Sequence, residues 1–236
     1  MKHFIPFIAL LVLSCTSDIK QNEVTAVGAM KNVMWKGELE GLIQVDTISP
    51  KEGLYGLGPL EGLRGEIMIN DGEIIVSKID NDQRIYIEKN VEASAPFFVY
   101  AHNSDWVERK LTDSIKTDDD IETYLNTAKG NYEDPFVFKL KGEISSATLH
   151  VQNLAEGTRV TNPKEAHQGQ VDFQLDAQPV EIIGFYSTRH QRVFTHHDRF
   201  IHMHVITADG KIMGHLDAIN IDAMMLYLPE AVAVKD

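Results

Sequence analysis

Three histidines near the C-terminus have the type and spacing of a metal-ligand set. They are His202, His204 and His215, and Asp209-Gly210 lies between the second and the third. Asp-Gly favours a two-residue type I′ turn, because both central residues of that turn need a positive φ. Such a turn pairs His204 with His215, and the two-residue period of a strand puts His202 on the same face. The spacing therefore predicts that three imidazoles converge from two strands.

Three neutral imidazoles with an open fourth position suit a catalytic Zn²⁺, or another first-row divalent ion, better than a closed structural site. Asp217 would lie across from His202, where it could orient that imidazole or bind the ion directly. The opposite face of the predicted hairpin is apolar and fit for a core, with Ile201, Met203, Val205, Ile212 and Leu216. The alternative is an ordinary hairpin with three half-buried histidines, and the apolar opposite face favours the metal site over it.

A second hairpin is predicted over residues 63–79, with Asp71-Gly72 at its turn. Counting back from this turn places Glu66 opposite Ser77, at the far end of the hairpin. The preceding stretch, residues 53–62, contains four glycines between large apolar residues, which predicts a tight, packed loop. It lacks both the strand–GxGxxG–helix context and the GK[ST] sequence of phosphate-binding loops, so we do not assign it to phosphate.

The rest of the chain is mostly strand-like. Strands are expected over residues 83–91, 95–103, 134–152 and 169–188, and a strand or short helix within residues 30–46. One helix is expected between Thr112 and Gly130, with aspartates at its start, and the Asp118–Asp120 run is interpreted as a solvated helix start and not as a metal site. The sequence thus predicts an α+β, predominantly β fold: two closely packed antiparallel or mixed sheets with one main helix, in a single compact unit over residues 30–230.

Composition limits the partners. The chain has 236 residues, 43% of them hydrophobic, and a formal net charge of −13. This charge argues against nucleic acid or an anionic membrane surface as a partner. A small anionic substrate would have to be bound by local cations or by a metal ion. The sequence leaves the oligomeric state open, with a homodimer as one option.

The N-terminus has the pattern of a targeting segment. Lys2 precedes the apolar run Phe4–Leu13, which is too short to span a bilayer. The sequence Val12-Leu13-Ser14-Cys15 matches the bacterial lipobox. We therefore expect residues 1–15 to be a lipoprotein signal peptide with Cys15 as the lipidated residue, residues 16–29 to be a tether, and the protein to be anchored on the periplasmic or extracellular side of a membrane. The alternative is a plain secretory signal with an incidental cysteine.

The order of these motifs resembles the alpha-acetolactate decarboxylase family over roughly residues 30–230. The matching segments are Gly56–Gly72, Pro96–Val99, Phe138–Gly142, Val180–Tyr186, His202–His215 and Leu228-Pro229. The resemblance implies a zinc-dependent lyase that removes CO₂ from 2-acetolactate to give acetoin. It also implies that His202, His204 and His215 bind the zinc and that Glu66, in the LxGE motif, lies in the active site.

Two positions depart from the family pattern. The family has an active-site arginine about eleven residues after the lysine of its KLxG-like strand, and the same count from Lys139 reaches His150. A second family glutamate corresponds here to Ala223. His150 could replace the arginine as a donor to a carboxylate, or it could be a strand histidine without a role. Compensating groups could come from the charged residues before the ligand hairpin, which are His190, His196, His197, Arg189 and Arg199.

The sequence is compatible with three functions. The first is zinc-dependent decarboxylation of acetolactate or a related 2-hydroxy-3-oxo acid, with Glu66 and His150 as catalytic residues. The second is a zinc enzyme with altered chemistry on the same scaffold, such as hydrolysis or isomerisation. The third is a lipoprotein that binds a metal or a small molecule without turnover. The motif match favours the first, and the two departures favour the others.

Overall fold

The computed structural model describes residues 20–233, so the predicted signal peptide with Cys15 lies outside the described residues. The first strand, β1 (Thr25–Val27), pairs with β8 (Phe98–His102). Val24 and Ala26 also pack against the core. The prediction of a tether over residues 16–29 is therefore wrong from Thr25 onward, because this segment adds an edge strand to a sheet. Among the described residues, no helix is both long and apolar enough to span a membrane.

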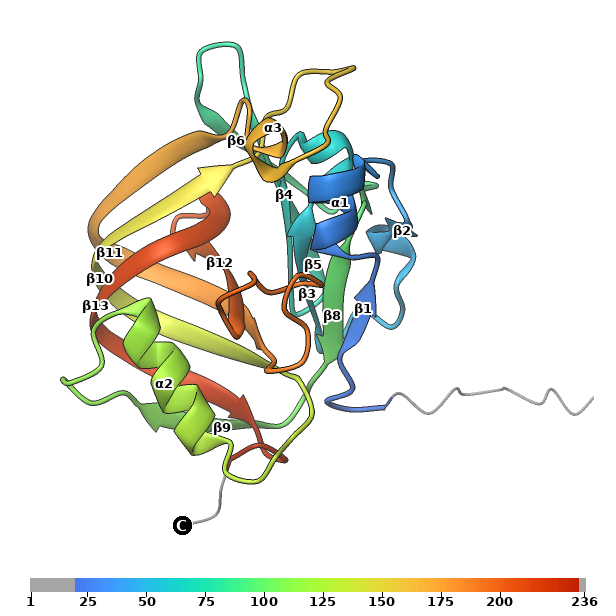
Figure 1. Ribbon diagram of the computed structural model, residues 1–236. Helices are drawn as coiled ribbons and strands as arrows, with labels where there is room; N and C mark the ends of the chain where they lie inside the picture. The colour runs from blue at the N-terminus through green and yellow to red at the C-terminus, as the bar shows by residue number, and fades with distance from the viewer. Residues whose placement is uncertain (1–19, 234–236) are drawn as a thin grey trace, which may run out of the picture.

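The first sheet has six antiparallel strands in the order β1-β8-β3-β4-β5-β6 (Figure 1). Its other members are β3 (Leu54–Pro59), β4 (Glu66–Asn70), β5 (Glu73–Ile79) and β6 (Ile85–Lys89). Asp71 and Gly72 connect β4 to β5 and have φ values of 48° and 82°, as a type I′ turn requires. Glu66 pairs with Ser77, which confirms the predicted register.

The middle of the glycine-rich segment, residues 54–59, is a strand and not part of the predicted loop. All six residues of β3 are buried. A Cβ atom on Gly56 or Gly58 would lie 2.6 Å or 2.7 Å from the Phe98 ring, so only glycine lets this strand pass beneath the aromatic side chain. The prediction of tight packing was correct. Gly56 and Gly58 allow close approach between strands, whereas Gly53 and Gly62, with φ values of 69° and 74°, lie in the turns that flank the strand.

The second sheet has five antiparallel strands in the order β10-β11-β12-β13-β9. They are β10 (Phe136–Val151), β11 (Val171–Tyr186), β12 (Ile201–Thr207), β13 (Met213–Pro229) and β9 (Trp106–Lys110). β10 also pairs with β13. Since β11 and β13 both pair with β12 as well, these four strands form a closed ring (Figure 1).

Helices and short elements complete the fold. They are α1 (Met30–Lys36), α2 (Asp118–Ala128), α3 (Pro163–Ala166), the 3-10 turns η1 (Val45–Thr47) and η2 (Glu61–Leu63), and a two-stranded sheet of β2 (Ile43–Gln44) and β7 (Ser94–Ala95). At the start of α2 the Thr117 hydroxyl accepts from the Asp120 N–H at 3.2 Å, and the Asp120 carboxylate accepts from the Thr117 N–H at 3.0 Å. This capping box confirms that the aspartate run starts a helix. The predominantly β fold with one main helix is confirmed.

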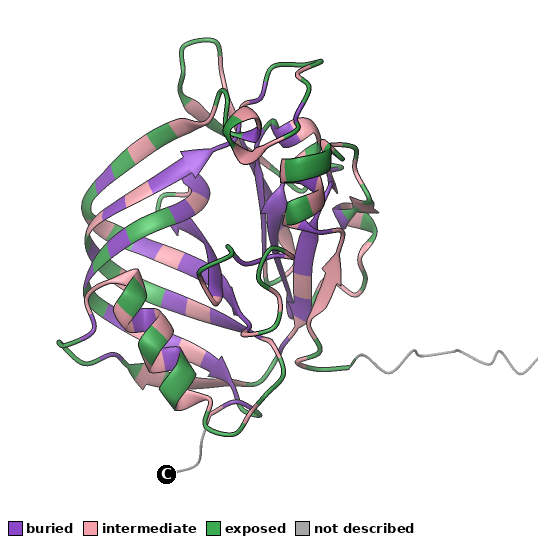
Figure 2. Ribbon diagram, viewed as in Figure 1, coloured by how far each residue is buried: buried purple, intermediate pink, exposed green. Residues whose placement is uncertain are grey.

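The two large sheets face each other across an apolar core. Leu57, Met68 and Val99 of the six-stranded sheet belong to one buried cluster with Ile183, Phe185 and Met213 of the five-stranded sheet. The Ser77 hydroxyl of β5 also contacts the Met213 sulfur of β13 at 3.8 Å. Figure 2 shows that the inner strands of the six-stranded sheet, β8, β3, β4 and β5, are buried along most of their length, whereas the long strands of the other sheet alternate between buried and exposed residues. Side chains at one end of this core are therefore enclosed between the sheets.

Candidate metal centre

The β12–β13 hairpin has the predicted register but a different turn. His204 pairs with His215 and Ile206 with Met213. Only Gly210 of the Asp-Gly pair has a positive φ, 70°, so the predicted type I′ turn is wrong. The Thr207 N–H donates to the Ile212 carbonyl at 3.0 Å, which leaves a four-residue loop. A two-residue and a four-residue loop centred on the same peptide bond give the same pairing, so the predicted positions of the histidines are unaffected.

The Asp209 side chain explains the longer loop. Its carboxylate accepts hydrogen bonds from the Thr207 hydroxyl at 2.7 Å and from the Lys211 N–H at 3.1 Å. The Thr207 hydroxyl in turn accepts from the Ile212 N–H at 3.2 Å. A two-residue turn would place these polar groups in the strand ladder, and here the hydrogen bonds within the loop satisfy them instead. Aspartate side chains commonly make such local hydrogen bonds in turns.

The three predicted ligands converge between the sheets. Ligand nitrogens of His202, His204 and His215 all lie within 4.8 Å of one another. The imidazole centroids are 4.9 Å to 5.4 Å apart. His202 and His204 are buried and His215 is partly buried. We call these three residues the histidine trio.

Several nitrogens of the trio lack a hydrogen-bond partner within residues 20–233. These are Nδ1 of His202 and both ring nitrogens of His204. Leaving a buried polar atom unpaired costs roughly 1–3 kcal/mol. Desolvation lowers the pKa of His202 to about 3 and those of His204 and His215 well below their ordinary value. Neutral imidazoles with free nitrogens are the form that binds metals, so the trio fits Zn²⁺ or another first-row divalent ion.

His150 lies beside the trio because of strand pairing. On one side His215 pairs with His204 of β12, and on the other it pairs with His150 of β10. Residues directly opposite each other share a face, so the three imidazoles form a row across neighbouring strands. The His150 and His215 ring centroids are 4.6 Å apart. The β10–β13 pairing joins segments far apart in the sequence, which is why spacing along the chain alone did not place His150 here.

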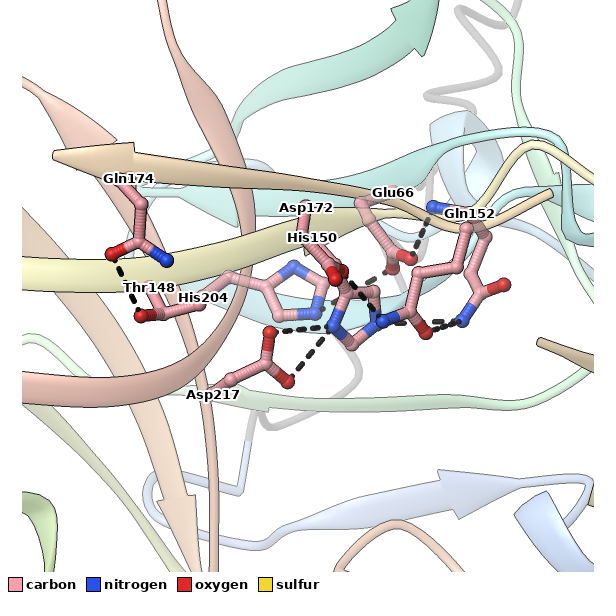
Figure 3. A network of polar contacts seen from close by, with 9 residues as sticks. Glu66, Thr148, His150, Gln152, Asp172, Gln174, His204 and Asp217 are labelled. Atoms are coloured by element: carbon pink, nitrogen blue, oxygen red, sulfur yellow. Dashed lines mark hydrogen bonds and ion pairs between the residues drawn. The ribbon is translucent and has the colours of Figure 1, made fainter.

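Asp217 contacts His150, not His202 as the sequence predicted. Both Asp217 carboxylate oxygens lie 2.8 Å from His150 Nδ1, which donates to them (Figure 3). The regular pairing of β12 with β13 ends at His204–His215, and a register shift interrupts the β10–β13 pairing next to Leu149. This irregularity turns Asp217 toward β10. Burial lowers the pKa of His150, but the hydrogen bond and charge of Asp217, together with the charge of Glu66, outweigh it and leave the pKa raised.

Glu66 reaches the same centre from the opposite sheet. It is 2% exposed, and its Oε2 lies 3.7 Å from His204 Nε2. Its Oε1 accepts from the Gln152 N–H at 3.3 Å, and the Gln152 side-chain amide nitrogen lies 3.3 Å from His150 Nε2 (Figure 3). Burial raises the pKa of Glu66 to about 8, against the opposing effects of His150 and the Gln152 N–H. A divalent ion beside His204 would favour the ionised carboxylate, as expected from the sequence.

Gln152 was not identified from the sequence. It follows His150 by two residues, and the two-residue period of a strand was the signal that could have found it. His150, His215 and Asp217 also form a second group with ligand atoms within 4.8 Å of one another. His215 belongs to both groups, so the geometry offers two overlapping sets of metal ligands.

Most of the candidate compensating residues do not reach the trio. Of the five, His196 comes close, with its ring centroid 5.8 Å from that of His215. The others bind elsewhere: Arg189 to Asp134, Arg199 to Asp118 and Asp119, His190 to Ser187, and His197 beside Asp198. Ala223, at the position of the second family glutamate, is exposed and pairs with Glu143 in the middle of β13.

A small cavity of about 30 Å³ adjoins the trio. Glu66, His150, Gln152, His202 and His215 line it together with residues from α1 and from the loops around α3 and before β12. The cavity and the trio beside it therefore bring together the three neutral imidazoles of the trio, the buried carboxyl group of Glu66 and the His150 imidazole held by a carboxylate. Such a set can bind a metal ion and can also move a proton.

Comparisons with known proteins find a matching family model and solved structures of the same fold. A family model described as alpha-acetolactate decarboxylase matches residues 26–234. An acetolactate decarboxylase structure from Bacillus subtilis subspecies spizizenii superposes with a TM-score of 0.74 at 20% identity, covering 88% of this chain and 85% of the other. A structure from Staphylococcus aureus, described as a protein of unknown function similar to alpha-acetolactate decarboxylase, gives 0.73 at 15% identity over 87% and 84%. No curated protein sequence matches the chain significantly.

Proposed function

Because the chain belongs to the alpha-acetolactate decarboxylase family, we propose that it removes CO₂ from 2-acetolactate, or from a similar 2-hydroxy-3-oxo acid, with the aid of a divalent metal ion, Zn²⁺ foremost. The observation that carries this proposal is the histidine trio, whose buried nitrogens lack hydrogen-bond partners among residues 20–233. At 15–20% identity the solved relatives support the fold, and the chemistry is argued from the site itself.

His202, His204 and His215 would hold the ion. When bound, it would act as a Lewis acid on oxygens of the substrate. The protein keeps the three imidazoles neutral by burial, and strand pairing fixes their positions before any ion arrives. Such preorganisation avoids a cost of rearrangement at the moment of reaction.

Glu66 and His150 are proposed to act on the substrate. Decarboxylation breaks the bond between the carboxylate carbon and C2, leaves the electron pair on the remaining fragment and requires a proton to replace CO₂. Glu66 is close enough to the trio to deliver or remove that proton. His150 occupies the position where the family pattern has an arginine, and Asp217 orients its ring so that Nε2 faces the small cavity beside Gln152. We assign it to binding the substrate carboxylate.

The decisive experiment measures product and metal together. Purified protein, loaded with Zn²⁺, is incubated with 2-acetolactate, and CO₂ and acetoin are measured. We expect both products to form in equal amounts and to disappear in a chelated sample. A protein that holds about one ion per chain and releases neither product would contradict the proposal.

Ala223 favours a second candidate, in which the site binds a metal or small molecule but has altered or no chemistry. The position of the second family glutamate carries no acid, and its exposed place on β13 does not face the small cavity. The experiment above distinguishes the candidates, because the second predicts metal binding without acetoin.

We further propose that lipidated Cys15 anchors the protein to a membrane, facing the periplasm or the cell exterior, and that its partner is a small anionic molecule. The lipobox-like sequence supports the anchor. The Cys15→Ser variant should be released from the membrane fraction or keep its signal peptide. A wild-type protein that fractionates as soluble and unlipidated would overturn this part of the proposal.

A further inference from the structure

A second cavity, of about 320 Å³, lies directly outside the metal centre. We call it the vestibule. Three segments form its walls: α1, the turn of α3 and the loop that precedes β12. Its main lining residues are Met30, Met34, Trp35, His167, Arg192 and His196.

The vestibule adjoins the small cavity at the trio. Met30, Met34, His167 and His196 line both. The inner cavity, about 30 Å³, has space for little more than a water molecule. The vestibule is within the lower range of volumes found for ligand-binding pockets, roughly 300–1,000 Å³. An organic substrate whose reacting atoms enter the inner cavity must therefore extend its remaining part into the vestibule.

The wall formed by α1 is apolar. Met30 and Met34, four residues apart, lie on one side of the helix, and Trp35 borders the same cavity. Trp35 is 59% exposed, which makes it the most exposed of the large hydrophobic side chains within residues 20–233. Methionine side chains adapt their shape to apolar ligands, and tryptophan offers a large apolar surface. This lining suits an apolar chain better than a small polar acid.

Backbone hydrogen bonds hold this wall in place. The Met30 N–H donates to the Val193 carbonyl at 2.8 Å, and the Lys31 N–H donates to the Arg192 carbonyl at 2.9 Å. At the other end Gly37, with a φ of 66°, closes the helix through bonds to Asn32 and Val33. The helix is therefore docked against the opposite wall of the vestibule, and the cavity between them is preformed.

Positive charge lies at the rim. Lys31 and Arg192 line the vestibule and are exposed to solvent. The chain as a whole carries a formal charge of −13 and would repel an anion. Two cations at the entrance provide a local attraction for an acid head group on its way to the trio.

We propose that the substrate is an amphipathic 2-hydroxy-3-oxo acid, larger than acetolactate, whose acid head group enters the metal centre and whose apolar substituent of several carbons lies in the vestibule. The assignment of the head group rests on the proposed function. The assignment of the apolar substituent rests on the vestibule alone, so the two can fail separately.

Binding of unreactive acids tests the vestibule. The probes are 2-hydroxy-2-methylalkanoic acids of increasing chain length, which have the carboxylate and hydroxyl but no ketone and so cannot lose CO₂ by this route. Titration into the Zn²⁺-loaded protein, followed by calorimetry and by tryptophan fluorescence, should show affinity rising about fourfold for each added methylene. Trp35→Ala should flatten this dependence. Tyr86→Ala, which removes another exposed aromatic side chain on β6, should leave it unchanged.

Turnover of reactive homologues separates the two claims. Faster decarboxylation of long-chain 2-hydroxy-3-oxo acids than of acetolactate, lost in Trp35→Ala, would support both. Chain-length-dependent binding without any decarboxylation would support the vestibule and overturn the proposed function. Decarboxylation of acetolactate with no gain in affinity or rate for longer chains would support the proposed function and overturn the vestibule proposal.

Discussion

The buried imidazoles on the two sides of the metal centre differ in whether their ring nitrogens have hydrogen-bond partners. On the β12–β13 side, His204 is fully buried, and neither ring nitrogen has a hydrogen-bond partner within the described chain. On the β10 side, His150 is similarly buried, but Asp217 and Gln152 contact its two nitrogens. A buried polar atom without a partner needs an explanation, and a ligand supplies one. The contrast supports the proposal that the first side binds an ion and the second orients a substrate.

Removing a ligand from the unpaired side should have the largest effect. His204→Ala eliminates one of three predicted ligands, so the metal content should fall from about one ion per chain to almost none, as measured by elemental analysis after gel filtration. His190→Ala, which alters a histidine bonded to Ser187 outside the centre, is the control and should keep its metal. Full metal content in His204→Ala would contradict the proposal that the side with unpaired nitrogens binds the ion.

Glu66 tests the proton-transfer role. Glu66→Gln keeps the shape of the side chain but cannot exchange a proton, so turnover should fall by about 10²–10⁴-fold while metal content is unchanged. Glu73→Gln, on the same hairpin but at the surface and paired with Lys89, should have normal activity. Near-normal activity of Glu66→Gln would mean that the acid lies elsewhere, and His150 would be the next residue to test.

Asp217 tests whether the two sides of the metal centre have separate roles, because it belongs to the second possible ligand group with His150 and His215. If it only orients His150, Asp217→Asn should lower kcat/KM by about tenfold and leave metal content intact, in the range seen when partners of functional histidines are removed. Asp176→Asn, which alters an exposed aspartate farther along β11 that pairs with Ser146, is the matched control and should leave both values unchanged. Loss of metal in Asp217→Asn would show instead that Asp217 is a ligand.

The two Asp-Gly hairpins show how much of the fold and of the metal centre could be predicted from the sequence. In both, the register was correct, because hydrophobic alternation and the turn position together fix which residues face each other. At Asp71-Gly72 the turn type was correct too. There the Asp71 carboxylate accepts from the distant Gly53 N–H, so it does not compete with the strand ladder. At Asp209-Gly210 the carboxylate bonds within its own loop, and the turn opens. The local sequence did not reveal which partner each aspartate would find.

The remaining errors arise from long-range pairing. His150 could be named by counting through a motif, but its contact with His215 depends on β10–β13 pairing, and Asp217 was misplaced because a register shift interrupts that pairing. Similarly, the glycine-rich segment was expected to be a loop because its strand character depends on Phe98, which lies in another strand. Spacing along the chain predicts contacts within a hairpin well and contacts between distant strands poorly.

The smallest expected effect tests what holds the trio in register. Thr207→Ala removes the hydroxyl that bonds to Asp209 and Ile212, and should lower the free energy of unfolding by about 1 kcal/mol in urea titrations. Metal content should not change, because β12 is also paired along its whole length with β11, and β13 pairs with β10 from His215 onward. Thr148→Ala, which removes an exposed strand hydroxyl bonded to Gln174, is the control. If Thr207→Ala also loses its metal, then the turn sets the register, and the trio is less preorganised than the closed ring of strands implies.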